Sequence, residues 1–140
     1  MNEWIIPASV ATAILISHSV KEAIHVAKNR TFSWYTFFLE TGGMPSSHSA
    51  AVSALTTSIF ALQGASALFW ASLVFSAVIV RDAFGVRKSV SDQAELVNTL
   101  LSRADIERKV DIILGHTPLQ AIIGVLVGIS SASLIIFWPF

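Results

Sequence analysis

The segment from Thr41 to Ser49, Thr-Gly-Gly-Met-Pro-Ser-Ser-His-Ser, combines residue types that suit phosphate binding and proton transfer. Its two glycines let the backbone approach a ligand closely. Pro45 fits the first turn of a helix, and the serines can satisfy the free N–H groups of that turn. Such a helix start attracts anions, phosphate above all, and His48 can give or take a proton near neutral pH. We predict an oxyanion pocket at a membrane surface.

Several charged residues flank this segment and could complete the pocket. Lys21 and Arg30 belong to a polar and aromatic stretch. They either snorkel to an interfacial belt or turn back toward the pocket. Arg81 and Asp82 end an apolar run. They either form a pair at the end of a helix or serve function, as ionisable residues at membrane depth do by default.

The composition places these groups in an integral membrane protein. Hydrophobic residues make up 54% of the chain and charged residues 13%. No charged residue occurs from 41 to 80 or from 112 to 140. The first of these runs would make about 60 Å of helix, which is two bilayer crossings. The absence of cysteine excludes disulfides, and a net charge of zero argues against a nucleic-acid partner.

We therefore predict an all-α fold, a membrane helical bundle forming a single domain over residues 1–140. About four transmembrane helices are expected, with spans near 4–20, 45–62, 65–80 and 117–138, the first retained and not cleaved as a signal peptide. The segments 21–40 and 81–115 are polar, and an amphipathic helix is expected from Ser91 to Asp111. Gly124 and Gly128 form a close-packing motif, which suggests a homodimer.

The distribution of charge predicts the orientation of this bundle. All nine Lys and Arg residues lie in the two polar segments, so the positive-inside rule makes that side cytoplasmic and places both termini on the other side. We expect a bacterial-type cytoplasmic membrane. The same arithmetic brings the Thr41–Ser49 segment, the cluster from Arg81 to Lys88 and His116 to one face of the bilayer, and this convergence indicates a single site.

The motifs resemble those of the type 2 phosphatidic acid phosphatase superfamily, and especially its small divergent branch. Met-Pro-Ser-Ser-His-Ser is similar to the superfamily's Pro-Ser-Gly-His motif. The fuller set is Thr41-Gly-Gly-Met-Pro-Ser-Ser-His-Ser-Ala50, Asp82-x-x-Gly-Val-Arg87, Gln93-Ala94 with Asn98, and Leu114-Gly-His-Thr-Pro118. These motifs extend from about Lys21 to Gly128, which is most of the chain.

The resemblance implies a phosphohistidine mechanism without a metal or other cofactor. It assigns His48 as the general acid, with His116 as the candidate nucleophile. It also implies that Ser46, Ser47 and Lys21 bind the substrate phosphate.

Two positions depart from the third motif of the superfamily, where Val110 and Gln120 replace its Arg and Asp. The phosphate-binding arginine is then expected to be Arg87 or Arg81, and the orienting carboxylate Asp82 or Asp111. The first motif also departs, because position 28 is Lys and Arg30 is not followed by proline.

Two functions follow from these patterns. The first is a membrane lipid-phosphate phosphatase that hydrolyses a phosphomonoester or pyrophosphate of a lipid, such as phosphatidic acid, phosphatidylglycerophosphate or a prenyl phosphate. The second is a non-catalytic membrane protein that binds an anionic lipid or phosphate and serves in transport, assembly or structure. Convergence of two histidines with cations favours the first, and the missing third-motif residues favour the second.

Overall fold

The computed structural model describes residues 4–32, 34, 37, 43–110 and 115–138. Over these residues the chain is all-α, as predicted, and its elements are α1 (Ile5–Asn29), α3 (Ser47–Gln63), α4 (Ala67–Phe84), α5 (Val86–Arg103) and α6 (Pro118–Ile136). Ser46, Ser66 and Thr117 cap the starts of α3, α4 and α6 with their side chains. These hydroxyls accept hydrogen bonds from backbone N–H groups that would otherwise lack partners.

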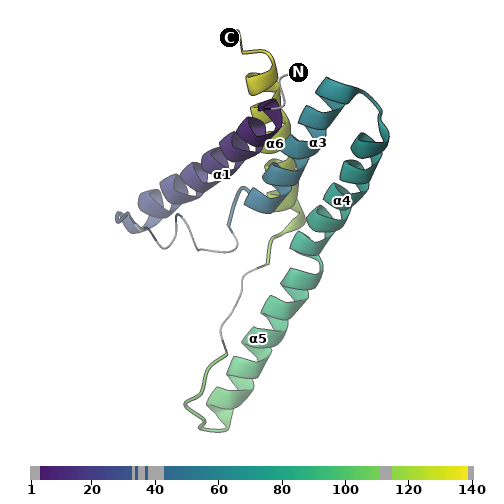
Figure 1. The fold of residues 1–140 in the computed structure, drawn as a ribbon. Coiled ribbons are helices and arrows are strands. Elements are labelled where there is room, and N and C mark those ends of the chain that lie inside the picture. Colours follow the sequence, from purple (N-terminus) through teal and green to yellow (C-terminus); the bar gives the residue numbers. More distant parts are fainter. Residues whose placement is uncertain (1–3, 33, 35–36, 38–42, 111–114, 139–140) are drawn as a thin grey trace.

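Helix α3 lies at the centre of the bundle and packs against α1, α4 and α6 (Figure 1). The start of α1 and the end of α6 lie at one end of the bundle, where the short connection from α3 to α4 also lies (Figure 1). The starts of α3 and α6 and the last turns of α4 lie at the opposite end, and α5 projects beyond it. We call this opposite end the site end.

The bundle places small residues inside and large apolar residues outside. Ala13, Ala50, Ala54 and Ala132 form its core, and fully buried serines lie around them. Large apolar side chains such as Val74, which is 65% exposed, cover the outer faces of the helices. Small interior residues that let helices approach closely, combined with an apolar exterior, are typical of helix packing in lipid.

The contact between α3 and α6 leaves no room for side chains at the two glycines of the predicted close-packing motif. A Cβ atom at Gly124 would lie 2.4 Å from the Ser46 carbonyl oxygen, and one at Gly128 would lie 2.0 Å from Ser53 Oγ. Ser53 Oγ also donates to the Val125 carbonyl across this contact, at 3.1 Å. The motif therefore packs two helices of one chain, and its glycines are not available to pair with a second copy.

Several helix boundaries differ from those expected. Helix α1 continues to Asn29, beyond the predicted span ending at residue 20. The amphipathic helix begins at Val86 and ends at Arg103, and not at Ser91 and Asp111. It starts directly after Gly85, so α4 and α5 form a nearly continuous rod (Figure 1).

By length and composition, two helical stretches within the described ranges are apolar enough to cross a membrane, Ala67–Arg103 and Pro118–Ile136. Helix α3 is shorter and rich in Ser and Thr. Because α1, α4 and α6 surround it, much of its surface faces protein and not lipid. Together with the exposed apolar side chains of the outer helices, this arrangement defines a membrane helical bundle.

Candidate functional site

The oxyanion segment forms the start of α3, with His48 as the second residue of the helix. Ser46 is the N-cap, so Pro45 lies before the helix and not in its first turn as expected. Ser46 is fully buried, and its N–H donates to the Gln120 carbonyl at 3.1 Å. Its hydroxyl accepts from the Ser49 N–H and hydroxyl at 3.4 and 3.1 Å. Ser46 thus holds α3 against α6. The side chains of the next two residues are more accessible, since Ser47 is partly exposed and His48 is exposed.

His116 lies just before α6 and is held by two distant parts of the chain. Its backbone N–H donates to the Ala83 carbonyl at 2.9 Å, and its ring Nδ1 lies 3.1 Å from the Gly43 carbonyl oxygen. Because a carbonyl only accepts, Nδ1 carries the proton and Nε2 carries the lone pair of the neutral ring. The Gly43 carbonyl therefore orients the His116 ring and leaves its Nε2 lone pair available.

Gly115 is needed for this path of the chain. A Cβ atom at Gly115 would lie 2.5 Å from the backbone N and Cα of Lys88. The segment that carries His116 therefore passes directly against the first turn of α5, and only glycine allows so close an approach.

The electrostatic surroundings of His116 favour its neutral form. The residue is 4% exposed. Burial lowers the pKa of His116 below its ordinary value of 6.5, and the positive charges of Lys21 and His48 lower it further. The hydrogen bond to the Gly43 carbonyl and the nearby Gln120 side chain act in the opposite direction and raise this pKa in part. A neutral imidazole is the form that can attack phosphorus.

The structure brings three of the predicted charged residues to the histidines. Lys21 is buried on α1 and acts electrostatically on both rings. Arg87 and Asp82 act on the His48 ring, and the Arg87 Nε donates to the Asp82 carboxylate at 2.8 Å. His48 also lies within the electrostatic range of His116. A cationic field around two imidazoles suits a phosphate dianion.

The remaining predicted residues lie elsewhere. The Arg81 guanidinium stacks on the Phe84 ring, 5.4 Å from its centroid, and lines a groove on the outer face of α4. Arg30 ends α1 in a left-handed conformation, with φ of 56°, and is exposed. Asp82 pairs with Arg87 instead of orienting His116. Asp111, the alternative carboxylate, lies outside the described residues.

Sequence reasoning identified Gln120 only as a departure from a motif and missed its contacts at the start of α6. Its side chain lies near enough to the His116 ring to raise the pKa of His116 in part, and its Oε1 accepts from the Thr117 N–H at 2.8 Å. Gln120 and Thr117 form a reciprocal capping box at the start of α6. The Thr-x-x-Gln spacing was the signal that could have identified this arrangement.

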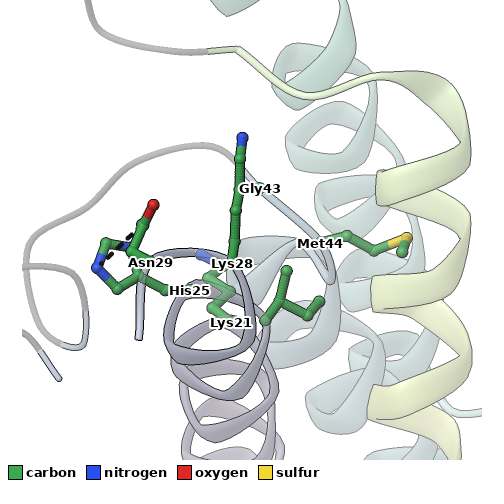
Figure 2. Close-up of a pocket in the computed structure, with 7 residues that line it drawn as sticks. Lys21, His25, Lys28, Asn29, Gly43 and Met44 are labelled. Carbon is green, nitrogen blue, oxygen red and sulfur yellow. Dashed lines mark hydrogen bonds between the residues drawn. The ribbon is translucent and has the colours of Figure 1, made fainter. Parts of the chain in front are cut away.

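A cavity of about 290 Å³ opens at the site end, and neither His48 nor His116 is among the residues that line it. It is formed by the last turns of α1 and by the chain just before α3, and Figure 2 shows its lining residues. These are Lys21, Ile24, His25, Lys28, Asn29, Gly43 and Met44. Gly43 connects the cavity to the His116 ring, and Lys21 connects it to both histidines. Within the described parts of the chain, no three His, Asp or Glu side chains gather as metal ligands.

The fold is that of a helical membrane protein, and its site end brings two histidines near Lys21 and Arg87. Residues 1–131 match the Divergent PAP2 family, so the chain belongs to that family. It is also 33% identical over 138 residues to "Uncharacterized membrane protein YuiD" of Bacillus subtilis (strain 168), covering 86% of this chain and 87% of that protein. No solved structure matches the chain. The predicted family resemblance is confirmed.

Proposed function

We propose that this membrane protein is a lipid-phosphate phosphatase that acts through a phosphohistidine and without a metal. The observation that carries the proposal is the meeting of His48 and His116 at the site end, within electrostatic range of each other and of Lys21. These groups come from α1, the start of α3 and the segment before α6. Because phosphoryl transfer is catalysed mainly by positioning and charge stabilisation, such a cluster suits it.

The two imidazoles would divide the reaction into two displacements. In the first, the His116 Nε2 lone pair attacks phosphorus, the bond from phosphorus to the lipid oxygen breaks, and protonated His48 gives its proton to that oxygen. In the second, neutral His48 takes a proton from water, the water oxygen attacks phosphorus, and the bond from phosphorus to nitrogen breaks. Phosphate leaves and both histidines return to their starting states. Lys21 and Arg87 would stabilise the charge on the phosphoryl oxygens.

A groove on the outer face of α4 supports a lipid as the substrate. The groove measures about 910 Å³, and Val74, Ala77 and Val78 line its apolar part. Arg81 and Asp82 line its polar end, and Asp82 is bonded to Arg87 near His48. A hydrocarbon chain could lie against the valines while its head group reaches the charged pair.

The test is phosphate release by the purified protein in detergent with a chelator present. We expect activity on at least one of phosphatidic acid, phosphatidylglycerophosphate or a prenyl phosphate. His116→Ala should reduce release to background, and His48→Ala should reduce it by about 10²–10⁴-fold, the usual contribution of general acid–base catalysis. Both variants should remain folded, with a cooperative thermal unfolding transition in detergent. Activity that survives both substitutions, or that depends wholly on added Mg²⁺, would contradict the mechanism.

We also propose that the site end faces the cytoplasm, because the positively charged residues of α5 and of the segment that follows it lie there. The chain has no cysteine, so single cysteines report sidedness cleanly. In intact cells, Ser102→Cys should resist an impermeant thiol reagent and Gln63→Cys should react with it. The reverse labelling pattern would contradict the orientation.

A specific observation favours the second candidate function, anionic-lipid binding without catalysis. Val110 stands where the superfamily has a phosphate-binding Arg, and its backbone is bonded to the Asn98 side chain on α5. That position therefore supplies no cation to the site. The same panel of lipids separates the two functions, because a binding protein would retain a lipid phosphate without releasing phosphate from it.

A further inference from the structure

Helix α5 presents one apolar face that is exposed along its whole length. Five apolar side chains of this face are exposed, namely Val86, Val90, Leu96, Val97 and Leu100. We call these five residues the exposed α5 face. A different side of the helix is covered by the chain itself, since Ser91 and Ala94 are buried and Asn98 bonds to Val110 in the segment that returns toward α6.

The hydrocarbon of the bilayer does not reach this face in the observed arrangement. Helix α4 has 18 residues, which make about 27 Å of helix at about 1.5 Å per residue and match the thickness of the hydrocarbon core. Helix α5 continues α4 in nearly the same direction beyond the site end (Figure 1). The exposed α5 face therefore projects into water, where an apolar stripe of this kind marks a site of interaction.

The junction between α4 and α5 opposes bending of α5 onto the membrane surface. The Arg87 Nε donates to the Asp82 carboxylate across the junction at 2.8 Å, and the Gly85 N–H donates to the Asp82 carbonyl at 3.2 Å. The segment that carries His116 closes the junction from another side, because a Cβ at Gly115 would lie 2.5 Å from the backbone N of Lys88. These contacts hold the rod together, so a partner must come to the helix.

The spacing of the exposed α5 face is that of a parallel two-stranded coiled coil. Val90 and Val97 are seven residues apart and occupy the a position of a heptad, and Leu100 occupies the d position. β-Branched residues at a with Leu at d favour a pair of parallel helices. Gln93 falls at the preceding d position. A single polar residue in such an interface favours the register in which it meets its own copy, where the two amides can bond.

The residues beside this stripe also suit self-association. In a parallel pair, the g residue of one helix lies beside the e residue of the next heptad in the other, so Leu96 would contact Leu101 of the second copy. The charged side chains of this stretch lie at the outer positions c and f instead, namely Lys88, Asp92 and Glu95. Two copies of α5 can therefore approach along this face without bringing like charges together.

We infer that the exposed α5 face binds the same face of a second copy of this chain, in a parallel pair with its two-fold axis along the membrane normal. Insertion in one orientation makes the two α5 helices parallel, and confinement to one membrane raises the effective concentration of each for the other. The glycines of α6 take no part, because they pack within one chain. The pairing goes beyond the proposed function and does not depend on it.

Single cysteines test the pairing directly, because the chain has none of its own. Val90→Cys, Val97→Cys and Leu100→Cys are oxidised in cell membranes with copper phenanthroline, and dimers are quantified on non-reducing gels. Glu95→Cys, at the outer f position of the same helix, is the matched control. We expect each of the three to cross-link at least about fivefold more than the control, because cysteines whose Cα atoms lie more than about 7 Å apart are not bridged.

Sedimentation of the purified protein in detergent measures the association without a cross-linker. Leu100→Glu introduces a charge into the interface and should convert the dimer to a folded monomer, whereas Thr99→Glu, at the outer c position, should remain dimeric. Gln93→Leu should tighten the dimer, since a polar residue in a coiled-coil interface gives specificity at a cost in stability.

The remaining outcomes would overturn the pairing. Equal cross-linking of Glu95→Cys would indicate random collision, and a dimer that persists in Leu100→Glu would place the interface elsewhere. If Val97→Cys does not cross-link but is protected from an impermeant thiol reagent in open membranes, lipid and not a second copy covers the face. If it reacts freely with that reagent, the face is uncovered.

Discussion

The seam between α3 and α6 and the arm formed by α5 are built in opposite ways. In the seam, Gly124 and Gly128 bring two backbones so close that an added methyl group would collide with oxygen atoms of α3. Among the described helices α5, in contrast, packs only against α4, and apolar side chains such as Leu96 are 61% exposed. The seam is fixed by close contact, whereas the arm is fixed mainly by its connection to α4.

The candidate site lies at the border between these regions, and its two histidines differ accordingly. His48 belongs to α3, so the seam fixes its position. His116 depends on the segment that returns from the arm, which is held at Ala83 and Gly43 and passes against Lys88. We therefore expect changes in the seam to alter the stability of the whole bundle, and changes in the arm to act locally.

The largest expected effect comes from filling the seam. Gly128→Val places methyl groups where Ser53 Oγ and the Ala50 carbonyl oxygen already lie within 2.2 Å of the added Cβ. Forcing extra carbons into a packed interface costs typically about 1–3 kcal/mol, and we expect the upper part of this range. Thermal unfolding in detergent measures the loss. Ile129→Val, on the neighbouring exposed position, is the control, and equal stability of both variants would mean that the seam is not close-packed.

A smaller effect is expected at the border, where Lys21 acts on His116. Burial and the Lys21 charge lower the pKa of His116, so its neutral, nucleophilic form persists below pH 6.5. Activity should fall only as the pH passes below that value, and Lys21→Met should move this acidic limb upward toward 6.5. A pH–rate profile of kcat measures the shift. If the acidic limb of the kcat profile stays in place or moves to lower pH in Lys21→Met, that limb does not report the titration of His116.

The same shift has a consequence for stability. Between the lowered pKa of His116 and 6.5, the unfolded chain binds more protons at this residue than the folded chain. Stability from this residue is therefore fully present above about pH 6.5 and is lost as the pH falls through the folded pKa. His116→Gln should remove this part of the pH dependence.

The smallest effect is expected in the arm. The Asn98 side chain donates to the Val110 carbonyl and accepts from the Val110 N–H, both at 2.8 Å. Removing these exposed bonds in Asn98→Ala should cost about 1 kcal/mol locally. Hydrogen exchange at the Val110 amide should then accelerate about fivefold, whereas amides of α3 and α6 should be unaffected. Thr99→Val is the matched control, and faster exchange throughout the bundle would contradict the independence of the arm.

The sequence predicted the seam better than the border. The uncharged runs identified α3 and α6, because they are local signals. The caps Ser46 and Thr117 were not predicted. The last turns of α1 were missed, since their polar residues were interpreted as an interfacial segment although they line the cavity as part of the helix. The sequence alone also could not show that both glycines pack within one chain, because the close fit of Gly128 against Ser53 depends on the fold.

The candidate site was predicted only where a motif marks a residue. His48, His116 and Lys21 came from motifs, and the structure brings them together. The partner of the His116 ring is a backbone carbonyl 73 residues away in the sequence, and no side-chain pattern marks such a contact. The position of His25 and Lys28 on the cavity wall was not predicted, because the cavity forms only after the chain folds.

The most direct test of the account is to locate the covalent phosphate. Wild-type protein is mixed with a phosphatidic acid, phosphatidylglycerophosphate or prenyl phosphate that it hydrolyses, quenched within a single turnover under alkaline conditions that preserve phosphohistidine, and mapped by mass spectrometry. The account predicts phosphate on His116 and none in His116→Ala. Phosphate on another residue, or sustained release of phosphate with none ever found on His116, would contradict it.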